Sequence, residues 1–552
     1  MEALSIISFI GFTVLVAIVA WYATRKTDES TADGYYLGGR TLGAITIAGS
    51  LLLTNLSAEQ IVGLNGQSFT EGILVMAWET LAAIAIIITA IFLLPKYMRS
   101  GITTIPEFIQ GRFDTQTKGI LSILFLVAYG VVLLPTILYS GSLAFSTMFD
   151  LPETLGISQS AVIWICVWTI GVIGVIYAIF GGLKAVAVSD LINAIGLLIG
   201  GLLIPVFGLM AIGDGSVGEG FQILWDSNPE KFDSIGAVDA SIPIGTIFTG
   251  MMIAQLYYWG TNQSILQRVF GAKSLKEGQK GMMLAAFVKF LIPVIVVLPG
   301  IIAWHLFEGN LDNADQAYPA LVRKVLPGAF MGFFAAVLFG AVLSSFNSLL
   351  NSSATLYGFD LYKQYVKKDA TEQQTVRAGK YFGLLLAILS MCIAPLIANA
   401  PDGLFAYIQE SLGSMSVPIL AVVLIGIITK KVPALGAKIV LTLGVVMYLV
   451  SQFIMKPYFI DAAMMEAAAQ GITDPKALNI LKAQAYPHFL HVMGILFVLN
   501  VAIMLVIGKL YPKLDVYQPK VTDEIDITPW KHAKTIGIVI AILVISTYLI
   551  FR

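Results

Sequence analysis

Two ionisable side chains lie within stretches of the chain that are otherwise apolar. Glu79 is the one charged residue in the segment 73–95, and Lys289 is the one charged residue in the segment 282–304. A charge inside a membrane is costly and needs a counter-ion, a ligand or a water-filled cavity. We therefore expect Glu79 to neutralise Lys289, either directly or through a bound ligand. The alternative is a structural ion pair that only holds helices together.

Two clusters of polar residues interrupt other apolar segments. One spans residues 54–60, and the other spans residues 255–263 and contains Gly260. Asn and Ser side chains compete with the backbone hydrogen bonds of a helix, so the first segment should unwind near its middle. Gly260 should break the second segment. Broken helices at matching places in two halves of a chain are typical of transporters that bind substrate at the membrane midplane.

A row of small residues follows one face of the segment 328–357. The row is spaced i, i+3, i+4, i+7, which places its members on one side of a helix; they are Ala341, Ser344, Ser345 and Ser348. Hydroxyl oxygens, together with carbonyls freed by a nearby unwound helix, suit a small hard cation. The lack of a carboxylate in the row favours Na⁺ over Ca²⁺. Close helix packing by small residues is an equally good explanation of the row alone.

The composition excludes several classes of protein. Of 552 residues, 57% are hydrophobic and 12% are charged, whereas soluble domains carry about 25% charged residues. A net charge of −1 leaves no basic surface for nucleic acid. There is no GxxxxGK[ST], HExxH or GxSxG motif, so we expect a transporter and not an enzyme. Cys166 and Cys392 lie in apolar runs, as small hydrophobic residues do.

Fourteen segments are apolar and long enough to cross a bilayer as helices. They are 3–23, 42–65, 73–95, 119–148, 158–181, 185–213, 241–260, 281–304, 328–357, 381–398, 404–428, 434–455, 488–508 and 535–551. An even number places both termini on one side. Of the 33 Lys and Arg residues, 25 fall in the odd-numbered connections and 6 in the even-numbered ones. This imbalance predicts that both termini lie outside the cell, on the periplasmic side.

Several motifs occur in an order that is found in a known family. They read SLLLTNLSAEQ, IPEF, GGLKAVAVSD, LYYWG, AAFVK and YIQE, at residues 50–60, 105–108, 181–190, 256–260, 285–289 and 407–410. Through them the whole chain resembles the sodium:solute symporter family, specifically its bacterial sodium/galactose (SGLT-like) branch. The resemblance implies a single all-α membrane domain with 14 transmembrane helices and a LeuT-type core. Two inverted five-helix repeats, 42–213 and 241–428, would form the core, and the helices of 3–23 and 434–551 would be peripheral.

The resemblance also implies a function and a set of site residues. The chain would import a galactose- or glucose-like monosaccharide with Na⁺, by alternating access, across a bacterial inner membrane. Na⁺ would bind the backbone carbonyls of Leu53, Leu56 and Ala341 and the hydroxyls of Ser344 and Ser345. The sugar would bind Gln60, Glu79, Gln255, Tyr258, Lys289 and Gln409. Tyr258 with Asn55 would form the inner gate, and the outer gate would consist of Leu64, Trp78 and Phe405.

Three positions depart from the pattern of the galactose transporters. Gln255 replaces an asparagine, Ala82 replaces a serine, and Trp78 replaces a tyrosine. A longer amide and a lost hydroxyl change the hydrogen bonds that a sugar can make, and such changes can separate epimers strongly. We therefore expect a sugar, without naming galactose as that sugar.

Asp190 and Ser348 are candidates for a second Na⁺ site or for an ion exit path, because family members use an aspartate and hydroxyls at these places. Asn347 interrupts the hydroxyl set, so we expect one Na⁺ per sugar. Asp190 is alternatively an ordinary charge at the membrane interface.

Two other functions remain open. A symporter for a carboxylate or an amino acid would need an unpaired cation in its site, and Glu79 beside Lys289 disfavours it. A sodium-responsive sensor that does not transport is disfavoured, because the sequence includes no appended signalling domain. Glu59, Glu410 and the segments 456–487 and 535–551 receive no role from the sequence.

Overall fold

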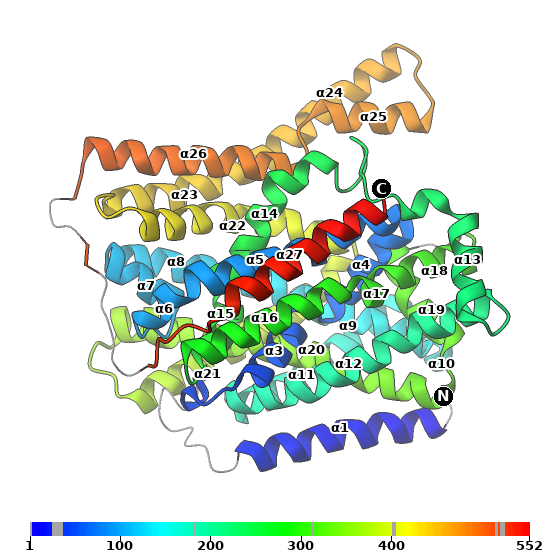
Figure 1. Cartoon of the computed structure of the whole chain (residues 1–552), viewed down its shortest axis with the longest axis horizontal. Helices are drawn as coiled ribbons and strands as arrows, with labels where there is room; N and C mark the ends of the chain where they lie inside the picture. Colours follow the sequence, from blue (N-terminus) through cyan, green and yellow to red (C-terminus); the bar gives the residue numbers. More distant parts are fainter. Residues whose placement is uncertain are drawn as a thin grey trace.

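Every regular element in the described part of the chain is a helix. The computed structural model describes residues 3–24, 37–180, 183–311, 313–399, 404–513, 517–518 and 525–552. Within these ranges the only β pairing consists of two isolated bridges, Leu42 with Ala272 and Ser274 with Asp526. The long helices run roughly side by side along one axis (Figure 1). The all-α prediction is confirmed.

Each of the fourteen expected segments contains helix. In chain order these helices are α1 (Ala3–Thr24), α3 (Ala44–Asn55) with α4 (Ala58–Glu71), α5 (Ala77–Ile88) with α6 (Leu94–Arg99), α8 (Thr115–Val127) with α9 (Leu134–Met148), α11 (Gln159–Phe180), α12 (Leu183–Ile212), α14 (Gly250–Gly260), α16 (Leu275–Leu291) with α18 (Leu298–Leu306), α20 (Gly328–Thr355), α21 (Glu372–Ile393), α22 (Leu404–Ile428), α23 (Ala434–Val450), α26 (Phe489–Leu510) and α27 (Ala533–Ile550).

Fewer helices are individually long and apolar enough to cross a membrane. Ten pass this test among the described residues, and eleven pass when the bent pair Leu275–Leu291 and Pro293–Leu306 counts as one. The three expected spans that do not pass on their own are 3–23, 42–65 and 241–260. The last two are the segments in which polar clusters predicted an interruption, so short half-helices replace a single long one.

The first interruption separates α3 from α4 at Leu56 and Ser57. Ser57 has an extended backbone, with φ −92° and ψ −179°, and Leu56 closes the end of α3 through a bond from its N–H to the Leu52 carbonyl. The predicted unwinding of this segment is confirmed. Because a helix end leaves its last carbonyls without intrahelical donors, the break exposes oxygen ligands inside the bundle.

The second interruption separates α14 from α15 (Gln263–Phe270). The α-helix ends at Gly260, where an added Cβ would lie 2.8 Å from the Leu93 side chain, and α15 restarts after the cap residue Asn262. The predicted break at Gly260 is confirmed, but the expected helix over 241–260 is too long. Residues 244–248 form a 3₁₀ turn, because Pro243 and Gly245 favour turns over continuous α-helix.

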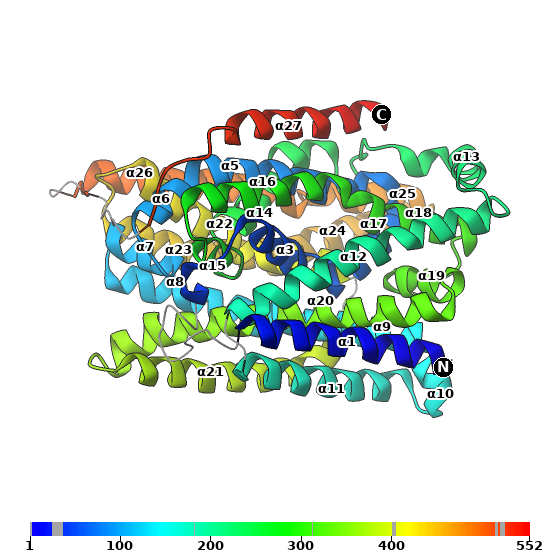
Figure 2. The ribbon, with the colours of Figure 1, turned by 60° about the horizontal axis from the view of Figure 1, so that its bottom comes forward.

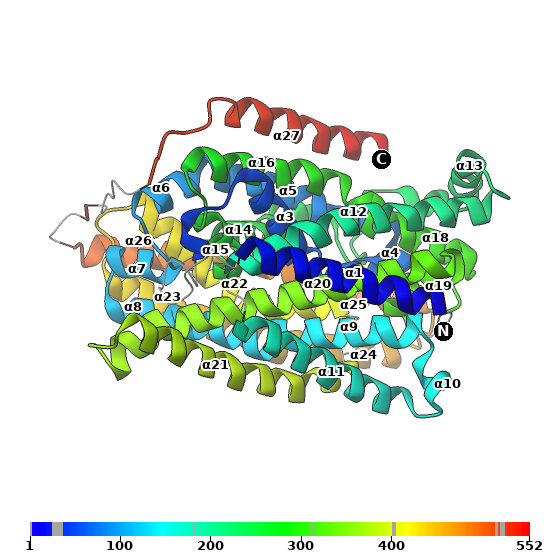
Figure 3. The ribbon, with the colours of Figure 1, turned by 90° about the horizontal axis from the view of Figure 1, so that it is seen from below.

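The remaining helices surround the broken ones. The first helix, α1, packs on α12 and α20, and α27 packs on α5 and α16. Figures 2 and 3 place α27 on the side of the bundle opposite α11 and α21. The segment 456–487, which the sequence left without a role, forms a hairpin of two helices, α24 (Lys456–Ala469) and α25 (Pro475–Ala485). In Figure 1 this hairpin extends at the end of the bundle where the beginning of α1 and the C-terminus lie.

Candidate functional site

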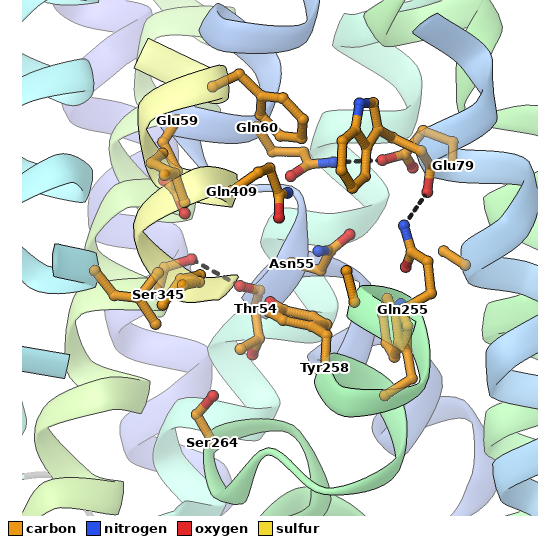
Figure 4. A pocket seen from close by; sticks show the side chains of 18 of the residues that line it. Thr54, Asn55, Glu59, Gln60, Glu79, Gln255, Tyr258, Ser264, Ser345 and Gln409 are labelled. Atoms are coloured by element: carbon orange, nitrogen blue, oxygen red, sulfur yellow. Dashed lines mark hydrogen bonds between the residues drawn. The ribbon is translucent and has the colours of Figure 1, made fainter. Parts of the chain in front are cut away.

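The broken helices enclose a polar cavity of about 70 Å³ (Figure 4). Such a volume holds several water molecules. Its walls come from α3, α4, α5, α9, α14, α15, α16, α20 and α22, so the tertiary fold assembles it from most of the chain. All six residues that were predicted for the sugar line it: Gln60, Glu79, Gln255, Tyr258, Lys289 and Gln409. Ala82 lines it too, so the missing hydroxyl at that position faces the cavity.

Glu79 and Lys289 form a direct ion pair at the cavity wall. Lys289 Nζ donates to Glu79 Oε2, and both side chains are fully buried. Gln60 donates from Nε2 to the other carboxylate oxygen, Oε1. The ammonium also lies 5.8 Å from the centre of the Trp259 ring. Because an ammonium carries three N–H donors and one is directed at Glu79, Lys289 can still donate to a ligand.

The other two amides contribute acceptors and donors on further helices. Gln255 donates from Nε2 to the Trp78 carbonyl over 2.7 Å, which joins α14 to α5 and leaves the amide oxygen of Gln255 for other partners. Gln409 extends from α22 toward Asn55 (Figure 4). A hydroxyl group both donates and accepts hydrogen bonds, so this mixture of donors and acceptors is complementary to several hydroxyls.

Two aromatic rings close the cavity on one side. Trp78 and Phe405 pack edge to face with centroids 5.2 Å apart, and each is only 3% exposed. Of the predicted outer gate, these two residues line the cavity, whereas Leu64 is fully buried and does not. Gly63 permits the closure, because a Cβ there would lie 2.8 Å from the Phe405 Cβ.

Asp315 anchors the beginning of the helix that carries Phe405. It lies in the short 3₁₀ element Ala314–Gln316, and its Oδ2 accepts the N–H of Leu404 over 3.1 Å where α22 begins. Burial raises the pKa of Asp315 to about 6, and the Leu404 N–H opposes this rise. The carboxylate also satisfies a free donor at a helix N-terminus, as capping groups do.

Tyr258 lies on the opposite side of the cavity, below Asn55 in Figure 4. It is on the last turn of α14, next to the second interruption. Asn262 holds this interruption open, because its Oδ1 accepts from Ser264 N over 3.0 Å and from the Tyr129 hydroxyl over 2.6 Å. The backbone just after Tyr258 is therefore held by the side-chain cap of Asn262 and not by a continuous helix.

Ser345 joins α20 to the broken end of α3. Its hydroxyl donates to the carbonyls of Thr54 at 3.1 Å and Leu53 at 3.4 Å. The neighbouring Ser344 hydroxyl is also buried and lies near the carboxylate of Asp190. Uncharged carbonyl and hydroxyl oxygens of this kind fit Na⁺, and Ser345 could accept the ion by rotating its hydroxyl hydrogen away.

The other predicted Na⁺ ligands lie on α3, at the break directly after it, and on α20. Leu53, Leu56 and Ala341 are all buried, and α3 packs against α20. The structure therefore brings together the unwound end of α3 and the face of α20 that carries the serines. Within the described ranges no group of three or more His, Cys, Asp or Glu residues could hold a metal ion.

Asp190 is fully buried on α12, inside the protein. Ser50 donates to its Oδ2 over 2.7 Å, while its Oδ1 has no hydrogen-bond partner. This contact needs a close approach of α3 to α12. Gly49 allows it, because a Cβ there would lie 2.9 Å from the Cα of Leu191.

Arg268 links the second interruption to the predicted Na⁺ region. It is fully buried on α15, and it donates to the Ser264 carbonyl and to the Ser348 hydroxyl. It also interacts electrostatically with Asp190. A permanent positive charge therefore already engages Ser348, and the sequence analysis did not identify it. Asn347, next to Ser348, is buried with no hydrogen bond to either side-chain polar atom.

Glu59 is a further cavity residue to which the sequence assigned no role. It lies in the first turn of α4, on the side of the cavity away from Glu79 (Figure 4). Its Oε2 is buried without a hydrogen-bond partner. The sequence does contain a signal for Glu59, because an ionisable residue directly after a predicted helix break is itself a candidate site residue.

Comparison with known proteins identifies the family. Residues 35–444 match the sodium:solute symporter family. The chain belongs to the sodium:solute symporter family. It is 43% identical over 548 residues to the uncharacterized symporter YidK of Escherichia coli, with 99% of this chain and 91% of that protein covered. It is 35% identical over 467 residues to the sodium/glucose cotransporter of Vibrio parahaemolyticus, with 79% and 83% covered.

Solved structures resemble this symporter in fold. A Na⁺-coupled sialic acid symporter in a substrate-bound outward-open state matches with a TM-score of 0.74 at 19% identity, over 94% of this chain and 99% of that one. The nucleobase-cation-symport-1 family transporter Mhp1, in a closed conformation, matches with a TM-score of 0.51 at 14% identity, over 92% and 99%. These solved structures show the fold, and the match over residues 35–444 confirms the predicted sodium:solute symporter family. The chain is a multi-pass membrane protein that couples the movement of a solute to Na⁺, and it is not an enzyme.

Proposed function

We propose that this symporter imports a neutral monosaccharide, similar to glucose or galactose, together with Na⁺. The observation that carries the proposal is the composition of the central cavity, where Glu79, Lys289 and three glutamines converge on one polar space. The charges of Glu79 and Lys289 neutralise each other, so this pair offers hydrogen bonds without adding net charge. The similarity to a sodium/glucose cotransporter and to a sodium/myo-inositol cotransporter 2 of Bos taurus supports a polyhydroxylated solute.

A carboxylate or an amino acid is the second candidate solute. Such a ligand would need an unpaired cation to balance its charge, and Lys289 is already paired with Glu79. Glu59 adds a further carboxyl group to the same cavity. Both observations favour an uncharged solute over an anionic one.

The proposed architecture is the LeuT-type core with fourteen spans. Residues 42–213 and 241–428 would be the two inverted repeats, each beginning with an interrupted helix. The breaks between α3 and α4 and between α14 and α15 support this division, because each opens its half of the core. The helices of 3–23 and 434–551 would be peripheral.

Na⁺ would act by stabilising the contact between α3 and α20. The carbonyls of Leu53, Leu56 and Ala341 and the hydroxyls of Ser344 and Ser345 would surround it. Sugar would then close the outer gate of Trp78, Phe405 and Leu64. When Na⁺ leaves toward the cytoplasm, α3 and α20 lose their link, and Tyr258 with Asn55 would release the sugar. A membrane potential supplies about 2.3 kcal/mol per charge per 100 mV for this cycle, in addition to the Na⁺ gradient.

One Na⁺ per sugar remains our proposal. Asp190 and Ser348 would be the ligands of a second ion, but the guanidinium of Arg268 donates to Ser348 and interacts with Asp190. A fixed positive charge at this place opposes a second cation. The buried Asp190 instead suits an exit path for the first ion.

The proposed location is a bacterial inner membrane with both termini on the periplasmic side. The basis is the imbalance of basic residues, 25 against 6, between the two sets of connections. The beginning of α1 and the C-terminus lie at the same end of the bundle, which agrees with an even number of crossings (Figure 1).

The test is uptake into proteoliposomes with an imposed Na⁺ gradient and a panel of labelled sugars. We expect at least one hexose to accumulate with Na⁺ outside and not with an equal K⁺ gradient. The same panel should include labelled amino acids and carboxylates. Accumulation of one of these, with no sugar transported, would replace the sugar proposal by the second candidate.

Changing Glu59 to Gln is expected to weaken solute binding. The unpartnered Oε2 would accept from a sugar hydroxyl. Gln keeps an acceptor oxygen but loses the charge, and charged hydrogen bonds exceed neutral ones by about 1–1.5 kcal/mol, or about 5- to 10-fold in affinity. The KM for uptake is the measurement, with the Na⁺ half-saturation as the second reading. Glu153→Gln is the control, because Glu153 is exposed on α10 (Leu151–Leu155) and does not line the central cavity. An unchanged KM in Glu59→Gln would show that this carboxyl does not touch the solute.

A further inference from the structure

The helix α27 lies against the two helices that carry the central ion pair. It packs on α5, which carries Glu79, and on α16, which carries Lys289. Gly537 allows the close approach, because a Cβ there would lie 2.7 Å from the Ile87 side chain on α5 and 3.8 Å from the Met283 side chain on α16. Figures 2 and 3 show α27 on the outer side of these helices. The helix therefore touches both halves of the ion pair's support.

One face of α27 packs on the protein, and the other face is apolar and exposed. The buried residues follow a helical stripe, and Tyr548 continues it four positions after the last of them; they are Ala533, Gly537, Ile540 and Val544. The exposed side chains include Ile538, Ile542, Ile545 and Leu549. A face of this kind suits contact with lipid. Tyr548 thus lies on the stripe that packs on the protein.

Tyr548 forms a hydrogen bond to Thr80, the residue after Glu79. The Tyr548 hydroxyl oxygen lies 3.0 Å from Thr80 Oγ1, and Thr80 is fully buried. The Thr80 hydroxyl itself donates to the Met76 carbonyl over 3.0 Å. Because a threonine hydroxyl has one hydrogen, Tyr548 is the donor to Thr80. A chain of two hydrogen bonds therefore runs from α27 through Thr80 to Met76.

This chain ends at the junction where α5 begins. Met76 is the last residue of the 3₁₀ segment Gly72–Met76, and α5 starts at the next residue. Trp78 and Glu79 of the first turn line the central cavity, whereas Thr80 does not. A threonine that donates to the carbonyl four residues back bends a helix slightly. A second partner for the same hydroxyl fixes that geometry, and with it the direction of Glu79.

The other hydroxyls near the end of α27 remain within the helix. Ser546 donates to the Ile542 carbonyl over 2.9 Å, and Thr547 donates to the Leu543 carbonyl over 3.0 Å. Such local bonds satisfy a hydroxyl without joining helices. Tyr548 instead reaches α5, so its hydrogen bond links two elements of the fold.

Both ends of α27 are attached to the rest of the protein. Before the helix, the Trp530 N–H donates to Gln279 Oε1 of α16 over 2.7 Å, and Gln279 Nε2 donates to the Ala90 carbonyl just after α5 over 3.0 Å. After the helix, the Phe551 carbonyl accepts the Ser234 N–H over 2.7 Å. These attachments set the height of α27 along α5 and hold Tyr548 opposite Thr80.

We propose that Tyr548 is a positioning residue for the solute, which acts through Thr80 to hold the first turn of α5 and the Glu79 carboxylate in one geometry. The inference rests on the proposed solute site at Glu79. Tyr548 does not line the central cavity, so it acts only through its partner. The proposed Na⁺ ligands lie on other helices, so loss of this hydroxyl should change the binding of solute and not that of Na⁺.

The experiment removes or keeps one hydroxyl at a time in the full chain. Tyr548→Phe keeps the ring and removes the donor, and Thr80→Val removes the acceptor at similar shape. Thr80→Ser is the conservative variant that keeps the hydroxyl. Ser546→Ala is the matched control, because that hydroxyl bonds only within α27. For each variant we measure the KM of Na⁺-driven uptake at saturating Na⁺, the maximal rate, the Na⁺ half-saturation and the melting temperature. The solutes are labelled D-glucose and D-galactose, and any other solute of the uptake panel that accumulates.

Tyr548→Phe and Thr80→Val are each expected to raise the KM about fivefold, which corresponds to about 1 kcal/mol for one neutral hydrogen bond. The double variant should resemble Thr80→Val alone, because both changes remove the same bond. Thr80→Ser and Ser546→Ala should have the wild-type KM. The maximal rate and the Na⁺ half-saturation should stay at wild-type values throughout. A lower melting temperature with an unchanged KM in Tyr548→Phe would mean that the bond only supports the fold, and would overturn the proposal.

A second measurement needs no transported solute. Hydrogen exchange, followed by mass spectrometry, reports how firmly the backbone of residues 72–82 is held. We expect faster exchange there in Tyr548→Phe and wild-type exchange in Ser546→Ala. Unchanged exchange in Tyr548→Phe would overturn the proposal whether or not a solute is found. Absence of sugar uptake by the wild-type protein, with faster exchange in Tyr548→Phe, would contradict only the proposed function.

Discussion

Lys289→Ala is expected to abolish sugar uptake, and neutralising its partner as well should restore folding but leave uptake with a raised KM. The single change leaves the Glu79 carboxylate buried without its counter-ion, which costs about 3–5 kcal/mol of stability. The double variant Glu79→Gln, Lys289→Met removes both charges at similar volume and avoids that cost. It still lacks the ammonium donors that face the cavity, so KM should rise about 10- to 150-fold.

The measurements are the melting temperature and the KM of Na⁺-driven uptake. A matched control exists in a second buried ion pair, Lys118 with Asp360 at 2.9 Å, which does not line the central cavity. Neutralising that pair by Lys118→Met and Asp360→Asn should leave KM unchanged. If the Glu79→Gln, Lys289→Met protein transports with the wild-type KM, the ion pair only supports the fold, as the structural alternative holds.

Ser345→Ala is expected to raise the Na⁺ concentration needed for half-maximal uptake by about tenfold, which corresponds to about 1.4 kcal/mol. The hydroxyl of Ser345 contacts the carbonyls of Leu53 and Thr54 at the open end of α3. Alanine removes one of the proposed oxygen ligands and also the hydrogen bond that joins α3 to α20. The change should act on Na⁺ first and on sugar only through it, so sugar KM at saturating Na⁺ should stay near the wild-type value.

The readout is the Na⁺ half-saturation of uptake at fixed sugar concentration. Ser353→Ala is the control, because Ser353 is also a buried hydroxyl on α20 but lies two turns from Ser345 and outside the predicted ligand set. It should have the wild-type Na⁺ requirement. Equal Na⁺ requirements in the Ser345→Ala and wild-type proteins would remove Ser345 from the Na⁺ site.

Local signals in the sequence predicted the two helix breaks well. The cluster 54–60 and Gly260 oppose helix through short-range hydrogen bonding and backbone freedom, and both act within a few residues. The start of the helix before Gly260 was less predictable. Residues 241–249 are apolar enough to extend a membrane span, but Pro243 and the packing of Gly250 against the Leu490 carbonyl make the helix begin only at Gly250.

The candidate site was predictable as a set of residues but not as a geometry. Polar residues in apolar segments are rare, so Glu79, Lys289 and the glutamines stand out by type alone. Their contacts depend on distant segments. The sequence did not indicate that Arg268 would reach Ser348, that Asp190 would be buried, or that Leu64 would stay out of the cavity lining.

The amino-acid sequence by itself determined that this is a helical membrane protein with two interrupted helices, because hydropathy and helix breaking are properties of neighbouring residues. Only the tertiary structure decided which polar groups face one another. It joined Glu79 to Lys289 across 210 positions and Ser345 to the end of α3 across 291. It also placed the hairpin of 456–487 and the Trp78–Phe405 pair around one cavity. Hydrogen bonds and ion pairs act over a few ångströms, so partners far apart in the chain are chosen by the packing of helices and not by local sequence.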